Sequence, residues 1–116
     1  MEQLNRIELR GIVGNARVTE TGGSRLVRMT LVTSFAYRSK QGDCIIESTW
    51  HQLYAFEGEH VRDVDTIRKG DKIHVVGRLV NRRVLTESGE ERSCTEVMVH
   101  RLERIAEKEP LQCEFQ

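Results

Sequence analysis

Three of the six aromatic residues of this chain lie within residues 49–56, which read Thr-Trp-His-Gln-Leu-Tyr-Ala-Phe. Successive side chains of a β-strand point to opposite faces, so Trp50, Tyr54 and Phe56 are expected on one face. That face is either packed into a core or open to a partner. Aromatic rings beside arginine form platforms on which unstacked nucleic-acid bases stack. The rest of the sequence favours the open platform.

Arginine dominates the basic residues, because 14 of the 18 are arginine and only 4 are lysine. A guanidinium group offers a planar fork for phosphate and a flat face for stacking, which an ammonium group does not. The formal net charge is zero. This balance argues against a protein that coats duplex DNA through positive charge alone.

The sequence contains no pattern typical of an enzyme or of a metal site. Its four histidines are scattered, and no H-E-x-x-H motif, zinc-type Cys/His spacing, phosphate-binding glycine loop or nucleophile elbow occurs. The carboxylates show no spacing that singles out a catalytic pair. We therefore expect no enzymatic activity, no cofactor and no metal.

Length and apolar content point to one domain in the cytoplasm. A chain of 116 residues is the size of a single domain. No apolar run approaches the roughly 18 residues that span a membrane, and the N-terminus lacks the apolar core of a signal peptide. The three cysteines, Cys44, Cys94 and Cys113, are odd in number and widely spaced, which predicts free thiols in a reducing compartment.

Turn signals at short spacing separate runs that are rich in Val, Ile, Leu and Thr, which is typical of a small all-β barrel or sandwich. The predicted strands cover residues 6–13, 25–37, 46–56, 72–80 and 94–101. Val61, Val64 and Ile67 recur at helical spacing and predict a short helix within residues 57–68. Gly14 and Gly77 are expected to mark bulges or bends. Residues 78–92 are expected to form a hairpin that projects beyond the barrel.

Three strands, a short helix and two strands are the element order of the OB-fold, a five-stranded Greek-key barrel. Several other small β folds share this number of strands. We predict an OB-fold domain over residues 1–105 and a short flexible tail over residues 106–116.

Six segments together resemble the bacterial single-stranded DNA-binding proteins in order and spacing. They are NRIELRGIVG (5–14), MTLVTS (29–34), TWH (49–51), IRKGD (67–71), VGRL (76–79) and TEV (95–97). The resemblance covers roughly residues 5–102. It implies an OB-fold, assembly as a homotetramer, and binding of single-stranded DNA by stacking of its bases on aromatic residues.

The resemblance also assigns site residues. The aromatic positions of the family fall on Tyr37, Trp50 and Phe56, and its basic positions fall on Lys69, Arg82 and Arg83. Tyr54 has no counterpart in the family but shares the predicted face of Trp50. Arg78, at the start of the projecting hairpin, completes the candidate set.

The sequence departs from the family at several positions. The aromatic that many members carry after the basic pair of the hairpin falls on Val84, and a basic position two residues after Trp50 is Gln52. The family ends in a long linker and an acidic tip, whereas this chain ends in Cys-Glu-Phe-Gln. We therefore expect no recruitment of proteins through an acidic tip.

Two alternatives remain open within these expectations. One is a dimeric accessory module of the primosome type, which also lacks the tail and binds single strands weakly. The other is an OB-fold that binds proteins and has lost nucleic-acid binding.

Overall fold

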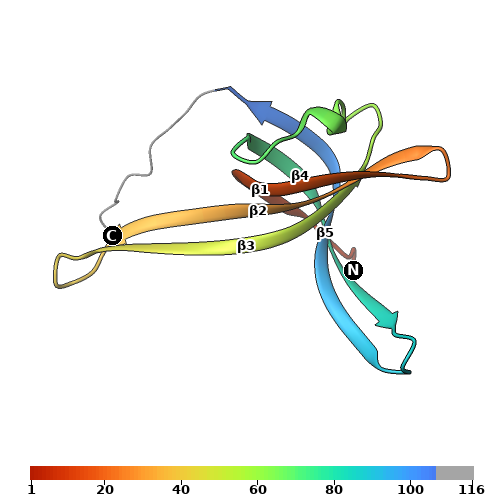
Figure 1. The fold of residues 1–116 in the computed structure, drawn as a ribbon. Helices are drawn as coiled ribbons and strands as arrows, with labels where there is room; N and C mark the ends of the chain where they lie inside the picture. The colour runs from red at the N-terminus through yellow and green to blue at the C-terminus, as the bar shows by residue number, and fades with distance from the viewer. Residues whose placement is uncertain (107–116) are drawn as a thin grey trace.

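Five long strands form a closed barrel in the computed structural model of the chain, which describes residues 1–106 (Figure 1). The strands are β1 (Ile7–Thr21), β2 (Ser24–Arg38), β3 (Cys44–Phe56), β4 (Lys72–Leu85) and β5 (Glu91–Ile105). They close in the order β1-β2-β3-β5-β4. β3 and β5 pair in parallel, and all other neighbours are antiparallel. The predicted all-β barrel is confirmed.

Three of the five strands, β1, β4 and β5, extend well beyond the predicted boundaries, and irregularities in their pairing let them bend without ending. The register shifts between Val13 and Asn15 in β1, and between Val76 and Gly77 in β4. Gly14 is the extra residue at the first shift, whereas at the second the extra residue is His100 of β5, across from Gly77, so both predicted glycines lie at irregularities of the pairing. A side chain on Gly77 would collide with the carbonyl oxygen of Met98, so only glycine allows β4 and β5 to approach this closely.

The β2–β3 and β4–β5 hairpins project from the barrel and carry part of the candidate site (Figure 1). β2 pairs with β1 only as far as Val32, so residues 33–49 form an arm in which β2 pairs with β3 alone. β4 and β5 likewise continue their ladder to the pair Leu85 and Glu91. Gly89 lies in the connecting turn with a φ of 84°, a left-handed conformation that favours glycine. The predicted projecting hairpin is confirmed.

The segment between β3 and β4 contains much less helix than predicted. The short helix is a single 3-10 turn, Val64–Thr66, and the rest of residues 57–68 is irregular. Val61, Val64 and Ile67 are nevertheless buried, because their three-residue spacing also suits a chain that returns repeatedly to the core. Asp63 has a φ of 56°, and this left-handed residue interrupts any longer helix. The predicted extent of the helix was wrong.

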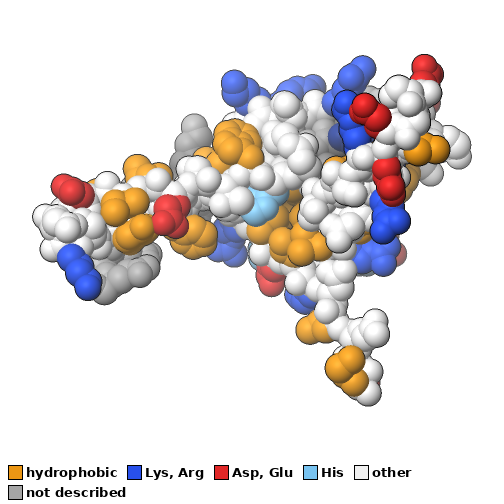
Figure 2. Space-filling model, turned by 90° about the horizontal axis from the view of Figure 1, so that it is seen from below, with side chains coloured by type: hydrophobic (Ala, Val, Ile, Leu, Met, Phe, Trp, Pro, Cys, Tyr) orange, Lys and Arg blue, Asp and Glu red, His pale blue; other side chains and the backbone are white. Residues whose placement is uncertain are grey.

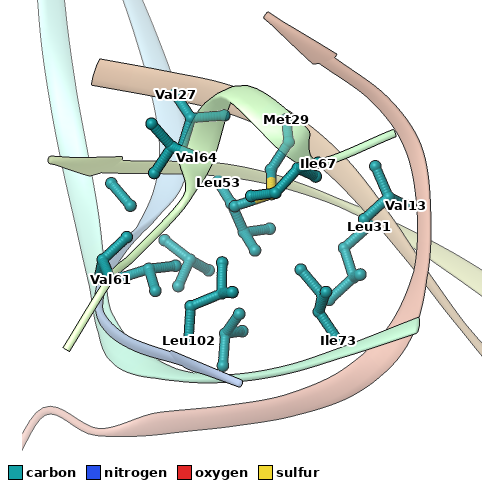
Figure 3. Packing of buried hydrophobic residues seen from close by; sticks show 14 residues of the cluster. Val13, Val27, Met29, Leu31, Leu53, Val61, Val64, Ile67, Ile73 and Leu102 are labelled. Carbon is teal, nitrogen blue, oxygen red and sulfur yellow. The ribbon is translucent and has the colours of Figure 1, made fainter. Parts of the chain in front are cut away.

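The core lies inside the barrel and is made of the inward side chains of alternate strand positions (Figure 3). Val27 and Leu31 of β2, Ile73 and Val75 of β4, and Val64 of the 3-10 turn are completely buried. Each such side chain contributes about 1.5–3 kcal/mol through its burial. Because the apolar side chains point into the barrel, the side chains at the alternate positions of the same strands point outward and can contact a partner.

Two further findings concern the described residues. Within residues 1–106, no helix is both long and apolar enough to cross a membrane. The same residues hold no cluster of His, Cys, Asp and Glu that could bind a metal ion. The predicted tail, apart from residue 106, lies outside the described residues, as does the expectation about the acidic tip.

Candidate nucleic-acid interface

The aromatic row of β3, which comprises Trp50, Tyr54 and Phe56, faces away from the core. Leu53 and Ala55, which alternate with it, are completely buried, whereas the side chain of Trp50 is 60% exposed. Phe56 is also exposed and Tyr54 is half-buried. The barrel has room inside for only one face of β3, so the larger aromatic side chains are left on its outer face.

Trp50 packs over the bulge of β1. The position that a Cβ on Gly14 would take lies 3.1 Å from Trp50 Cη2 and 2.7 Å from Thr30 Oγ1. The missing side chain of Gly14 therefore leaves space for the indole ring. One face of the ring rests on the barrel while much of the side chain stays open to solvent.

The turn that carries Lys69 lies beside this bulge. The backbone N–H of Gly70 donates to the carbonyl of Val13, and the N–H of Val13 donates to the carbonyl of Asp71, each over 2.8 Å. The exposed Lys69 therefore lies beside the part of β1 over which Trp50 packs, although this turn and β1 are far apart in the sequence.

Tyr54 is flanked by two arginines. Arg28, its direct partner on β2, places its guanidinium carbon 5.6 Å from the centre of the Tyr54 ring, and Arg82 of β4 places its own at 5.9 Å. Both distances fit cation–π contacts. The ring is therefore partly covered by cations, and a base that stacks on it has to displace at least one arginine.

Glu96 of β5 binds both of these arginines. Its Oε2 lies 3.2 Å from Nη1 of Arg28, and its Oε1 lies 3.6 Å from Nη1 of Arg82. Cys94 donates its thiol hydrogen to Oε1 over 3.4 Å, and this hydrogen bond raises the pKa of the Cys94 thiol. Four strands thus contribute to one cluster on the outer face.

The remaining basic candidates are divided between the two faces of the β4–β5 hairpin. Tyr54 pairs with Met98, and Met98 pairs with Arg78, so Arg78 shares the outer face with Tyr54. Arg82, four residues further along β4, lies on this face too. Arg83 points to the opposite face, where its side chain is highly exposed. Its Nε lies 3.6 Å from Oε1 of Glu91.

Tyr37 does not share the face of Trp50. The unbroken register of β2 and β3 places Tyr37 on the side of the arm that carries Phe35 and Glu47. Its hydroxyl donates to Oε1 of Glu47 over 2.7 Å, and this bond raises the pKa of Tyr37. The structure therefore brings together Trp50, Tyr54 and Phe56, with Arg78 and Arg82 beside them, and leaves Tyr37 and Arg83 on other faces.

Arg28 and Glu96 are the two residues of this surface that sequence reasoning missed. Arg28 lies between the buried Val27 and Met29, so alternation alone indicates that it faces outward. Its position opposite Tyr54, however, depends on the register of β2 against β3, which no local pattern specifies.

Hydrophobic side chains gather along the β2–β3 arm and on the adjoining body of the barrel (Figure 2). Phe35 is 71% exposed and lies on one face of the arm, whereas Ile46 is exposed on the other. Large apolar side chains that are exposed along a projecting arm are typical of a binding or assembly surface.

Comparisons with known proteins agree with this arrangement. The sequence model of the Single-strand binding protein family matches residues 4–105. A Plasmodium falciparum SSB, solved as a complex with single-stranded DNA, has a TM-score of 0.75 and 24% identity over 90% of this chain and 96% of its own. A deletion mutant of the single-stranded DNA-binding protein from Thermus aquaticus has a TM-score of 0.69 and 21% identity over 88% of this chain.

The chain spans half the length of the Thermus protein chain. At these identities, the two structures establish the fold, and the predicted OB-fold is confirmed. The match of the family model extends over nearly the whole described barrel and rests on the sequence itself. The chain therefore belongs to the single-strand binding protein family, a family of proteins that are not enzymes and whose membership implies binding of single-stranded DNA.

Proposed function

We propose that this chain binds single-stranded DNA along the outer face of β2, β3, β5 and β4, without selecting a sequence. The observation that carries the proposal is the exposed indole of Trp50, held on the barrel surface in line with Tyr54 and Phe56. Bases stack on Trp50 and Phe56. Lys69, Arg78 and Arg82 contact the phosphates.

Sequence tolerance follows from the kind of contact that this surface offers. Every base has a π-face, so stacking on an aromatic ring is similar for all four bases. Sequence-specific duplex readers insert a helix or a strand ribbon into a groove. The described residues contain no helix longer than the 3-10 turn, and the proposed surface is a row of side chains on a curved sheet.

In this proposal, the bound strand contacts Tyr37 and Arg83 only if it follows a longer path. They lie on the far faces of the two projecting hairpins, so a strand reaches them by wrapping around those hairpins. The exposure of Arg83 and the position of Tyr37 on the arm are compatible with such a path.

We further propose that the bound form is a homo-oligomer that protects single strands during replication, recombination or repair in the cytoplasm. A tetramer is the favoured state and a dimer is the alternative. Within residues 1–106, residues 7–11 of β1 pair with β4 only, so no described strand covers their second edge, which can pair with another copy. The exposed free thiols of Cys44 and Cys94 suit a reducing compartment.

The proposal is tested by titrating the protein with oligo-dT while the fluorescence of Trp50, the only tryptophan of the chain, is recorded. Quenching by the single strand and none by the matching duplex is the expected result. With a labelled oligonucleotide, Trp50→Ala should weaken binding roughly tenfold or more, since stacking contributes about 1–3 kcal/mol per base. Trp50→Phe retains a ring and is the matched control. Equal affinity of all three proteins would remove Trp50 from the site.

One observation favours a second function, an OB-fold module that binds protein and has lost nucleic-acid binding. The apolar side chains of Phe35 and Ile46 are exposed on opposite faces of the arm. A chain that shows no affinity for oligo-dT at low salt would support this second function over the first.

A further inference from the structure

Glu96 is an acidic residue in the middle of a surface that is proposed to bind a polyanion. Its side chain is only 12% exposed, and its two oxygens contact Arg28 and Arg82 separately. These are the two arginines that lie against the Tyr54 ring. One carboxylate therefore occupies the cations that flank the central aromatic residue of the row.

A carboxylate and a phosphate compete for the same groups of an arginine. Both present a pair of anionic oxygens that accept charge-assisted hydrogen bonds from the guanidinium fork. A phosphate that binds Arg28 and Arg82 has to take the place of Glu96 or lie next to its negative charge. The second arrangement is repulsive, because two like charges would lie within a few ångströms of each other.

We propose that Glu96 is an internal competitor for DNA phosphate, which holds Arg28 and Arg82 over Tyr54 in the free protein and is displaced from them by the bound strand. This inference rests on the proposed function, and it adds a regulating residue to that site. When the arginines turn from Glu96 to a phosphate, they uncover the Tyr54 ring for a base. Cys94 remains as a hydrogen-bond donor to the released carboxylate.

The proposal has a distinct signature in the salt dependence of binding. An arginine already neutralised by Glu96 contributes less to counterion release than a free one. The logarithm of affinity for single strands falls with the logarithm of salt concentration by about 0.7 per phosphate contact. Freeing both arginines should therefore steepen this slope by up to about 1.4.

The test compares Glu96→Gln with Glu91→Gln. Both remove one negative charge from the same hairpin, but Glu91 pairs with Arg83 on the opposite face. Glu96→Gln should bind oligo-dT roughly fivefold more tightly at low salt, as expected for removing one unit charge about 4 Å from a phosphate in water. Its salt slope should steepen. With an oligo-dT too short to wrap around the hairpin to Arg83, Glu91→Gln should leave the slope unchanged.

Two outcomes would overturn the proposal. Equal effects of the two variants would reveal a general charge effect, and weaker binding by a folded Glu96→Gln would make Glu96 a support for the arginines. The gain should also disappear when Glu96→Gln is combined with Arg28→Gln and Arg82→Gln.

A measurement on the unaltered chain covers the case in which Glu96→Gln does not fold. The carbon resonance of the Glu96 carboxylate should shift when oligo-dT is added, and an unchanged resonance would overturn the proposal. Wild-type protein that binds no oligo-dT would overturn the proposed function together with this inference. Wild-type protein that binds it without a contribution from Glu96 would overturn this inference alone.

Discussion

The indole ring of Trp50 occupies the space that a side chain on Gly14 would need. A Cβ built on Gly14 would lie 3.1 Å from Trp50 Cη2 and closer still to Cζ3, with Thr30 Oγ1 at 2.7 Å on another side. The bulge of β1 and the aromatic row of β3 are thus linked through direct contact. The backbone of Gly14 does not have a positive φ, so the requirement for glycine here is spatial.

Gly14→Ala should therefore move Trp50 without unfolding the barrel. The new methyl group meets the far end of a side chain that is exposed and can rotate outward. We expect a red-shifted Trp50 emission and weaker binding of oligo-dT. Gly58→Ala is the matched control, because a Cβ there would meet nothing within 4 Å. Unchanged emission and affinity in Gly14→Ala would show that the seating of Trp50 on the bulge does not matter for binding.

Val84→Trp should tighten the binding of oligo-dT. Val84 is exposed on the same face of the β4–β5 hairpin as Arg82, two residues further out. An indole at this position extends the row of rings, and each stacked base contributes about 1–3 kcal/mol. Leu85→Trp adds the same ring on the opposite face and should leave the affinity unchanged for an oligo-dT too short to wrap around to that face. Equal gains in the two variants would indicate a non-specific effect of surface tryptophan.

The stability of the fold should decrease between neutral and mildly acidic pH because of His51. Its ring is half-buried, with Nε2 2.9 Å from Thr33 Oγ1, and burial lowers the pKa of His51. The unfolded chain therefore takes up this proton at a higher pH than the folded chain. The contribution of His51 to stability is complete above the ordinary histidine pKa of about 6.5. It is lost as the pH falls from that value towards the lowered pKa of the folded state.

The measurement is the urea midpoint of wild type and of His51→Gln at neutral and at mildly acidic pH. The variant retains an amide that can bond to Thr33 but has no titrating ring. We expect wild type to lose more stability than the variant on acidification. Identical losses in the two proteins would assign the acid sensitivity to other groups.

The chain should assemble at least into a homodimer, and into a homotetramer as the complete state. None of the described strands pairs with the second edge of β1 at residues 7–11, and such an edge is usually covered in a stable protein. The apolar side chains exposed on the β2–β3 arm add a second surface for contact. Sedimentation at micromolar protein concentration is the check. A monomer over the whole accessible concentration range would contradict the prediction.

The sequence by itself determined the features that depend on neighbouring residues. The two-residue period of a strand placed Trp50 on the opposite face from Leu53 and Ala55, and the turn residues located the strands. Glycines inside strand patterns marked both bulges. Each of these depends on the backbone preferences and side-chain directions of a few consecutive residues, which a sequence displays directly.

Only the tertiary structure decided which outward residues meet. Arg28, Tyr54, Arg82 and Glu96 come from four strands, and their contact requires the register of three strand pairs at once. The same register separates Tyr37 from Trp50, although the sequence grouped them. A shift of one residue would reverse every such relation while leaving each strand pattern intact. Register is fixed by closure of the whole barrel around its core, so no single segment of the sequence contains it.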